Sequence, residues 1–241
     1  MKIIVVDIGN TNQKAAVYED GHLVDFVSVP QLSVSIFETW KSRFGVSYLM
    51  YSSVGSQDDV LLKQLGGCFK CYRLQDLPLP FEMAYQTPET LGSDRLACMV
   101  AAADLYPGQP VLVVQCGSCL TFDLLSGNVY QGGSISPGLQ MRFKALHGFT
   151  ARLPLLELDP LVSLTGVSTQ TCIQAGVWHG YLSECESMIE KYCTHYENLN
   201  IILTGGDAEM VKDKLKKSIF AHPNLVLYGL FVMLSKYVEN Q

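Results

Sequence analysis

A short polar turn behind an apolar strand is the feature that most constrains the fold of this chain. Residues 3–6 are Ile-Ile-Val-Val, a run of β-branched residues that predicts a buried strand. Residues 7–11, Asp-Ile-Gly-Asn-Thr, follow at once. The glycine lets the backbone come close to a ligand, the Asn and Thr side chains are short and polar, and the aspartate can hold Mg²⁺. The run therefore predicts a phosphate-binding turn at the end of the first strand.

The same design recurs in the second half of the chain. Residues 113–118, Val-Val-Gln-Cys-Gly-Ser, repeat the pattern of residues 5–10, Val-Val-Asp-Ile-Gly-Asn. Two expected hairpin turns, at residues 20–21 and 126–127, follow these runs at nearly the same offset. An internal repeat of this kind predicts a duplicated architecture in which each half carries one such turn.

The composition narrows the class of protein. Of the 241 residues, 48% are hydrophobic and 17% are charged, which supplies a core and carries no signature of disorder. The net charge of −6 argues against nucleic acid or an anionic membrane as the main partner, because both need a basic face. No apolar run approaches the roughly 18–20 residues that cross a bilayer, and signal-peptide features are lacking, so we expect a soluble cytoplasmic protein. The eight cysteines are then expected to be reduced thiols.

Strand and helix signals alternate along the chain. We predict strands at residues 3–6, 14–18, 23–29, 48–51, 69–74, 111–114, 120–125, 129–130 and 201–203. We predict helices at residues 33–44, near 57–65, at 91–103, from Pro137, from Ser168-Thr169 to about residue 190, and from Asp207. Pro107, Gly108 and Pro110 form the clearest boundary and predict two halves, residues 1–108 and 109–241.

Two halves that each carry a phosphate-binding hairpin resemble the plan of the actin-like ATPase and sugar-kinase superfamily. This resemblance implies an α/β fold of two duplicated ribonuclease H-like halves. It also implies an interdomain ATP cleft, in which the two turns reach the phosphates from opposite sides. Asp7 has a structural alternative, since an aspartate at a strand end often caps a turn. Its combination with Gly9 and with the repeat at residues 115–118 favours the phosphate site.

The segment at residues 85–95, Tyr-Gln-Thr-Pro-Glu-Thr-Leu-Gly-Ser-Asp-Arg, makes the resemblance more specific. With it the chain resembles the type III pantothenate kinases. That family is marked by Asp-x-Gly-Asn-Thr-x-x-Lys, matched by residues 7–14, and by Pro-x-x-x-Gly-x-Asp-Arg, matched by residues 88–95. A later Pro-Gly and a Thr-Gly-Gly have counterparts at residues 137–138 and 204–206. The resemblance implies ATP-dependent phosphorylation of pantothenate to 4′-phosphopantothenate, the first step of coenzyme A biosynthesis.

The resemblance also implies roles for individual residues. Asp94 would be the general base that takes the proton of the pantothenate hydroxyl as that oxygen attacks the γ-phosphate of ATP. The residues expected to contact ATP are Asp7, Ile8, Gly9, Asn10, Thr11, Asn12, Gln13, Lys14 and Ser118, with Mg²⁺ on Asp7. The residues expected to contact pantothenate are Tyr85, Gly92, Ser93, Asp94, Arg95 and Thr169, the last from the partner subunit of a homodimer.

Several of these residues have ordinary structural explanations as well. Asp94 and Arg95 also suit an acid–base pair at the start of a helix. Lys14 suits a solvent-facing strand position, and Thr169 suits a helix N-cap, a role compatible with substrate contact. Residues 205–206, two glycines before a helix, favour close approach of the nucleotide but equally suit a tight turn.

One departure from the family pattern concerns the second turn. Gln115 stands where the family has an aspartate that helps to bind an activating monovalent cation such as K⁺ or NH₄⁺. Glutamine keeps an oxygen ligand but loses the charge, which predicts a weakened or absent cation site, with Asp123 as a further candidate ligand. Ser118 replaces a threonine but keeps a hydroxyl for phosphate.

This departure leaves three hypotheses open. The chain is a working kinase without the cation, or a catalytically impaired relative that binds nucleotide or pantothenate and acts in regulation. The third hypothesis is an ATPase, or a kinase for another small hydroxylated substrate, because the phosphate turns alone do not choose the acceptor.

The cysteines suggest a further alternative. Cys68 and Cys71, and likewise Cys116 and Cys119, have the Cys-x-x-Cys spacing of zinc and redox sites. The gap between the two pairs is about twice that of a zinc ribbon, and the second pair flanks the predicted phosphate turn. Small buried thiols are therefore the favoured interpretation.

Overall fold

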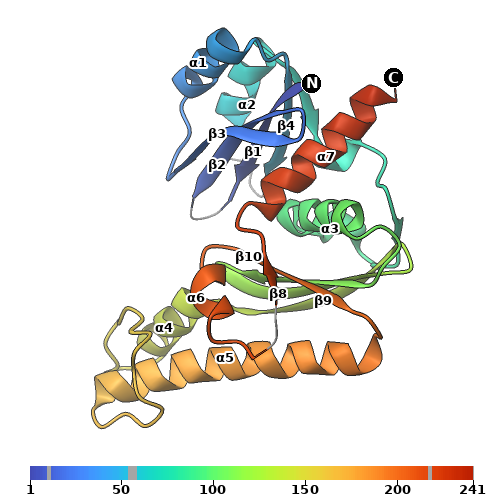
Figure 1. The fold of residues 1–241 in the computed structure, drawn as a ribbon. Helices are drawn as coiled ribbons and strands as arrows, with labels where there is room; N and C mark the ends of the chain where they lie inside the picture. Colours follow the sequence, from blue (N-terminus) through green and yellow to red (C-terminus); the bar gives the residue numbers. More distant parts are fainter. Residues whose placement is uncertain (10–11, 54–58, 217–218, 241) are drawn as a thin grey trace. The chain divides into compact units, whose positions relative to one another are not determined.

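The computed structural model describes residues 1–9, 12–53, 59–216 and 219–240, and shows a mixed α/β protein with two sheets (Figure 1). The chain divides into two compact units. The first unit contains Met1–Gly108, Gly127–Gln131 and Asn224–Gln241, and the second contains Gln109–Ser126 and Gly132–Pro223. The predicted halves, residues 1–108 and 109–241, were defined by the internal repeat of the sequence, and this division stays a prediction. The compact units differ from them because the C-terminal segment joins the first unit.

The sheet of the first unit is built on the strand that precedes the predicted phosphate turn. Its strands are β1 (Lys2–Ile8), β2 (Gln13–Glu19), β3 (His22–Val29), β4 (Tyr48–Ser53) and β5 (Lys70–Arg73). Their order is β3-β2-β1-β4-β5; β2 is antiparallel to β1 and β3, whereas β4 is parallel to β1 and β5. The five strands predicted for this part of the chain are confirmed to within two residues at each end.

Helices cover both faces of this sheet. They are α1 (Val34–Phe44), α2 (Asp59–Gly66), α3 (Ser93–Leu105) and α7 (Leu225–Glu239), with the short elements η2 (Leu74–Asp76), β6 (Glu82–Met83) and η3 (Pro88–Thr90) between them. Ile4, Val6 and Ile8 pack in one core cluster with residues of α1 and α2. Since side chains alternate along a strand, Asp7 points to the other face, where α7 and α3 pack (Figure 1).

The sheet of the second unit repeats the same strand order. Its strands are β7 (Val111–Cys116), β8 (Cys119–Ser126), β9 (Val129–Pro137), β10 (Asn200–Thr204) and β11 (Phe220–Ala221). The order β9-β8-β7-β10-β11 matches β3-β2-β1-β4-β5, and β6 pairs with the first residues of β9. As in the first sheet, the central strand has an antiparallel neighbour on one side and a parallel neighbour on the other. The predicted fold class, a duplicated α/β architecture, is therefore confirmed.

The helices of the second unit enclose an apolar core on one face of its sheet. They are α4 (Leu139–Gly148), α5 (Thr169–His195) and α6 (Ala208–Lys212). The predicted N-cap of α5 is confirmed at Ser168, whereas Thr169 is the first helical residue and not the cap. The Ser168 side chain accepts a hydrogen bond from the Thr171 backbone N–H, and the Thr171 side chain accepts one from the Ser168 backbone N–H. Trp178, Tyr181, Phe122 and Phe143 are the largest side chains in this core.

Three local predictions were wrong or incomplete. The second hairpin turn is centred on Gly127 and Asn128, which both have positive φ, rather than on residues 126–127. Pro137 ends β9 instead of starting a helix, because α4 begins after the N-cap Gly138. Helix α7 was not predicted at all.

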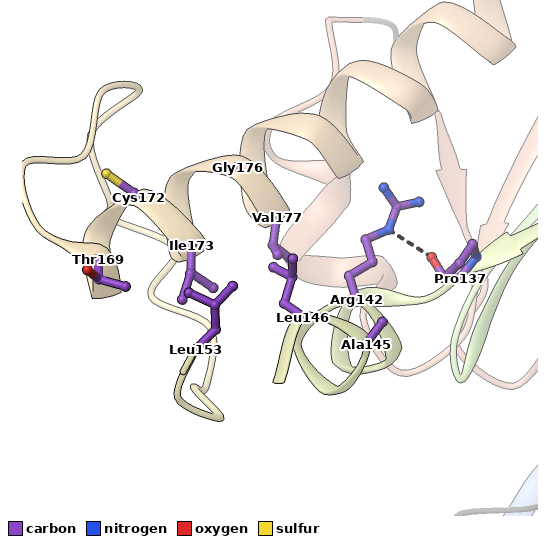
Figure 2. Close-up of a pocket in the computed structure, with 10 residues that line it drawn as sticks. All are labelled: Pro137, Arg142, Ala145, Leu146, Leu153, Thr169, Cys172, Ile173, Gly176 and Val177. Carbon is purple, nitrogen blue, oxygen red and sulfur yellow. Dashed lines mark hydrogen bonds between the residues drawn. The ribbon is translucent and has the colours of Figure 1, made fainter. Parts of the chain in front are cut away.

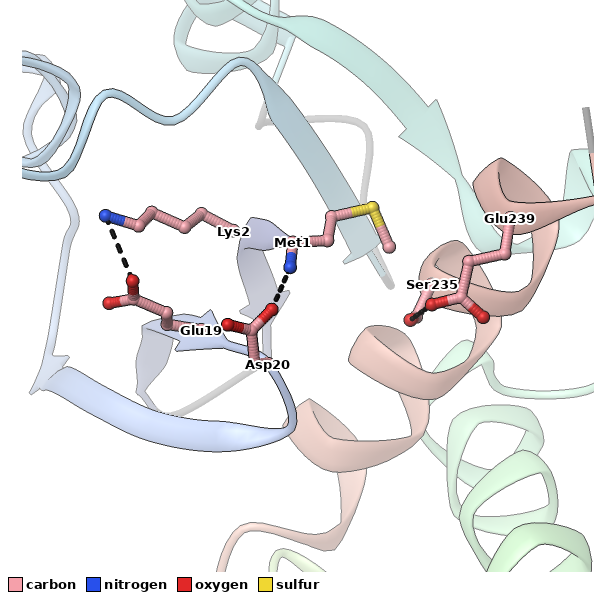
Figure 3. Close-up of polar contacts among 6 residues, drawn as sticks. All are labelled: Met1, Lys2, Glu19, Asp20, Ser235 and Glu239. Carbon is pink, nitrogen blue, oxygen red and sulfur yellow. Dashed lines mark hydrogen bonds and ion pairs between the residues drawn. The ribbon is translucent and has the colours of Figure 1, made fainter.

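Polar contacts on the surface of the first unit add little to its stability. The amino group of Met1 pairs with Asp20, and Lys2 Nζ lies 3.1 Å from Glu19 Oε1 (Figure 3). Ser235 Oγ donates to Glu239 Oε1 one helical turn later. Exposed contacts of this kind stabilise little, because water competes for the polar groups and screens their charges. Among the described residues, no helix is both long and apolar enough to span a membrane.

Candidate functional site

A chain of buried hydroxyl groups links the first strand to the helix that carries the predicted base. The Ser52 hydroxyl, on β4, donates to Asp7 Oδ1 at 3.1 Å. Ser52 Oγ also lies 3.0 Å from Ser93 Oγ, in the first turn of α3. Both serines are buried. The strand end with Asp7 and the helix start with Asp94 are thus fastened together inside the first unit.

The electrostatics of this contact bear on Asp7. Burial, and next the neighbouring Asp94 carboxylate, raise the pKa of Asp7 to about 6, whereas the Ser52 hydrogen bond and then Lys14 act to lower it. Lys14 lies directly opposite Asp7 in the β1–β2 pairing. Two acidic side chains and one lysine therefore meet at the end of β1, an arrangement that favours a bound cation between the carboxylates.

The helix start leaves room for the Asp94 side chain. Gly92 is the N-cap of α3, and a Cβ atom there would lie only 2.6 Å from Asp94 Oδ1. The absence of a side chain at Gly92 thus makes room for this carboxylate. Asp94 is half-buried and lies in the first turn of the helix, where the backbone N–H groups favour negative charge.

Arg95 is buried beside two tyrosine rings. Its Nη2 donates to the Tyr130 hydroxyl at 3.1 Å, and its Cζ lies 5.9 Å from the centre of the Tyr85 ring. The Tyr85 and Tyr130 rings are themselves 5.8 Å apart. Tyr85 and Arg95, both predicted to contact substrate, therefore meet in one cluster. Tyr130 was missed, because the sequence gives it no signal beyond its place in a strand.

The remaining residues of the first predicted turn are described in part. A Cβ atom at Gly9 would lie 3.0 Å from the Asn12 carbonyl oxygen, so the backbone here is tight. The Gln13 side-chain oxygen accepts the Leu32 backbone N–H at 2.7 Å and is engaged within the fold. The predicted ATP contacts Asn10 and Thr11 lie outside the described residues.

The second predicted turn carries a row of polar side chains on one face of its sheet. Gln115 pairs with Thr121 on β8 and with Thr204 on β10, and Asp123 lies further along the same face. Asp123 is buried and accepts a hydrogen bond from the Thr121 hydroxyl at 3.0 Å. The amide, hydroxyl and carboxylate oxygens of this row form a donor set suited to a cation. Ser118, at the tip, is exposed.

Glycines keep the backbone around this turn close together. Gly205, at φ +101°, would place a Cβ atom 2.2 Å from the Cys116 carbonyl oxygen. A Cβ atom at Gly138 would lie 2.1 Å from the Gly117 carbonyl oxygen. Gly205 is thus needed for packing against the turn, whereas Gly206 has open space around it. The sequence did not separate these two roles.

Thr169 lies at the edge of an apolar cavity between α4 and α5, with a volume of about 760 Å³ (Figure 2). Ile173 and Val177 point into it from α5, and Leu146 and Leu153 face them. Arg142 lies at one end, where its Nε donates to the Pro137 carbonyl oxygen and its Nη2 pairs with Glu184. The adjoining segment exposes several large apolar side chains, namely Phe149, Leu155, Leu161, Leu164 and Val167.

The cysteines form no metal centre in the part of the chain that the structure describes, where no group of three or more His, Cys, Asp or Glu side chains could hold a metal ion. None of the eight cysteines forms a disulfide bond. Cys116 and Cys185 are buried in the apolar core of the second unit. For these two, the interpretation as small core residues fits the structure.

Comparison with known proteins identifies the family. The family described as "Type III pantothenate kinase" matches residues 3–191. A type III pantothenate kinase from Christiangramia forsetii is 42% identical over 235 residues, which cover 96% of this chain and 97% of the relative. The chain belongs to the type III pantothenate kinase family. Nothing found supports the alternative of an impaired regulatory relative.

Solved structures show that this pantothenate kinase family member has a widespread fold. A protein from Campylobacter jejuni, described as a Baf family transcriptional activator, aligns with a TM-score of 0.64 at 21% identity and covers 98% of this chain and 99% of its own. A polyphosphate/ATP-glucomannokinase from Arthrobacter aligns with a TM-score of 0.52 at 13% identity, over 99% of both chains. At these identities the likeness concerns the fold alone.

The raised pKa of Asp7 predicts a pH-dependent stability for this pantothenate kinase family member. The folded-state pKa of about 6 exceeds the ordinary aspartate pKa of 3.8. Protonation of Asp7 therefore stabilises the folded state. This stabilisation is fully present below pH 3.8 and is lost as the pH rises through about 6. Asp7→Asn keeps an oxygen for Ser52 without the charge. Near pH 8 we expect the free energy of unfolding of Asp7→Asn to exceed that of the wild type by roughly 1–3 kcal/mol. This difference should vanish near pH 4.

Thermal unfolding of nucleotide-free protein between about pH 4 and pH 8 measures this effect. Asp76→Asn, at an exposed carboxylate on η2, is the matched control. An Asp7→Asn protein less stable than the wild type near pH 8 would contradict the prediction.

Proposed function

We propose that this chain transfers the γ-phosphoryl group of ATP to the primary hydroxyl of pantothenate. The observation that carries the proposal is the contact Asp7–Ser52–Ser93, which joins the strand end of the predicted phosphate turn to the helix start that bears Asp94. The 42% identity to a type III pantothenate kinase supports the choice of acceptor.

In this proposal Asp94 is the general base. The pantothenate hydroxyl oxygen forms the new bond to the γ-phosphorus while the bond from that phosphorus to the bridging oxygen of ADP breaks. The hydroxyl proton passes to Asp94. Asp94 is half-buried in the first turn of α3, so part of its surface can reach the hydroxyl that it would deprotonate. Arg95 would bind the pantothenate carboxylate, since a planar guanidinium matches that group.

The residues near Asp7 fit a magnesium ion bound with ATP. The carboxylates of Asp7 and Asp94 are close enough for Asp94 to raise the pKa of Asp7, and a divalent cation would offset that repulsion. Mg²⁺ would neutralise charge on the phosphates as the phosphoryl group moves. Lys14, opposite Asp7 on β2, would bind phosphate oxygens, as would Ser118 with its exposed hydroxyl.

The row of Gln115, Thr121 and Asp123 supports a weak monovalent-cation site. These side chains share one face, and the buried Asp123 carboxylate supplies a charge that Gln115 lacks. We expect K⁺ to stimulate the enzyme only modestly. Gln115→Asp, which adds a second carboxylate, should lower the K⁺ concentration needed for half-maximal activity.

A homodimer is the proposed assembly, with Thr169 completing the partner's pantothenate pocket. The exposed apolar side chains beside the cavity at α5 support it, because large exposed apolar patches usually mark an interaction surface. Sedimentation should give twice the mass of one chain, and a monomer at micromolar concentration would contradict this.

The proposed location of the protein is the cytoplasm. The use of ATP as phosphoryl donor favours it.

A direct assay tests the proposed function. Purified protein with pantothenate, ATP and Mg²⁺ should release ADP and form 4′-phosphopantothenate, detected by mass spectrometry. Parallel reactions with and without K⁺ or NH₄⁺ measure the cation response. No product under any of these conditions would refute the proposal, and ADP release that occurs only with other hydroxylated acceptors would favour a different substrate.

A further inference from the structure

We propose that Tyr130 is a positioning residue that sets the affinity and selectivity for the acceptor carboxylate. It would do so by holding Arg95 and Tyr85 in place, and this inference rests on the proposed pantothenate kinase activity. Tyr130 lies at the start of β9, in the segment Gly127–Gln131 that belongs to the first unit. It is a different element from the helix and loop that carry Arg95 and Tyr85.

The Tyr130 side chain contacts both of these residues. Its hydroxyl oxygen accepts a hydrogen bond from Arg95 Nη2 at 3.1 Å, and its ring lies 5.8 Å from the Tyr85 ring. Tyr130 is fully buried and Arg95 is only 5% exposed. A buried side chain that bonds a buried guanidinium leaves that guanidinium little freedom to rotate, which fixes the orientation of its plane.

The Tyr130 backbone also pairs with the segment that precedes Tyr85. Residues 82 and 83, in β6, pair with residues 129 and 130 in β9. The Ala84 backbone N–H then donates to the Tyr130 carbonyl oxygen at 3.0 Å, one residue before Tyr85. The same residue therefore anchors Tyr85 through its main chain and Arg95 through its side chain. Tyr130 is fully buried and offers no surface to the substrate, whereas Tyr85 is half-buried and Arg95 keeps a small exposed fraction.

This arrangement has a consequence for specificity. If Arg95 binds the acceptor carboxylate, a looser guanidinium lowers the affinity for acceptors that carry this group. It has no such effect on an acceptor in which the carboxylate is absent. The hydroxyl of Tyr130 thus acts on binding of one end of the substrate, whereas Asp94 acts on the hydroxyl at the other end.

The test removes the hydroxyl alone. Tyr130→Phe keeps the ring and the strand pairing, so we expect the KM for pantothenate to rise about tenfold while kcat changes less than about twofold. For pantothenol, which has the same primary hydroxyl but no carboxylate, the KM or inhibition constant should change less than about twofold. Tyr18→Phe, at a buried tyrosine elsewhere in the first unit, is the control and should leave the KM for pantothenate unchanged.

A double-mutant cycle with Arg95→Ala tests whether Tyr130 acts through Arg95. If Tyr130 acts through Arg95, adding Tyr130→Phe to Arg95→Ala should cost no further affinity. An unchanged KM in Tyr130→Phe, or an equal loss for pantothenate and pantothenol, would overturn the inference. A wild-type protein that does not phosphorylate pantothenate would instead refute the proposed function, so the two failures are distinguishable.

Discussion

Asp94→Asn protein is expected to lose turnover by a factor of about 10²–10⁴. Asparagine has the size of aspartate and should fit against Gly92 as the native side chain does. It cannot accept the proton of the attacking hydroxyl, because an amide is not a base at neutral pH. The loss should therefore appear in kcat, whereas the dissociation constants of ATP and pantothenate should change only slightly. Single-turnover product formation and equilibrium binding measure the two quantities separately.

The matched control is a second aspartate on the same helix. Asp104, near the C-terminal end of α3, accepts a hydrogen bond from the Tyr228 hydroxyl at 2.7 Å and pairs with Lys236 at 2.6 Å. Asp104→Asn removes the same charge from the same helix but is expected to keep kcat within about threefold. If Asp94→Asn turns over as fast as the wild type, Asp94 is not the base. If both variants lose kcat alike, the effect belongs to the helix and not to the carboxylate at its start.

Much of the fold followed from local sequence patterns. The apolar run before Asp7 and its repeat before Gln115 correctly predicted the central strand of each sheet, since a buried strand needs a continuous apolar sequence. Helix α7 escaped prediction for a related reason. It has buried residues on nearly every side, from Leu225 to Leu234, and periodicity does not distinguish a helix from a buried strand in a short apolar run of this kind.

The predicted site residues were identified by motif, but their supporting contacts were not. Ser52 is 45 residues from Asp7, and Tyr130 is 35 residues from Arg95. Neither has a pattern in its own neighbourhood that points to these contacts, because they arise from the pairing of strands and the packing of α3. Gly92 shows the opposite case: it lies inside a recognisable motif, and the structure supplies the physical reason for it.

The packing of α3 suggests the second large effect, a loss of stability in Gly229→Ala. Gly229 lies in α7 where this helix crosses α3, and a Cβ atom there would be 1.9 Å from the Ala97 carbonyl oxygen and 2.7 Å from its carbonyl carbon. Both contacts are with backbone, so no side-chain rotation can relieve them. The two helices would have to separate, and we expect the free energy of unfolding to fall by about 2–4 kcal/mol. Thermal unfolding should show a midpoint lower by roughly 5–10 °C.

Intrinsic helix propensity makes the sign of this prediction informative. In an open helix position, replacing glycine by alanine stabilises by about 1 kcal/mol. Gly180 in α5 has open space where a Cβ atom would lie. Gly180→Ala is therefore expected to raise the midpoint of thermal unfolding slightly, and it serves as the control. The same chemical change thus has opposite signs at two helix positions, and the difference measures the close approach of α7 to α3. Because α3 carries Asp94, Gly229→Ala should also reduce kcat. A variant as stable and as active as the wild type would show that the helices can separate without cost, and that their close contact does not hold the base in place.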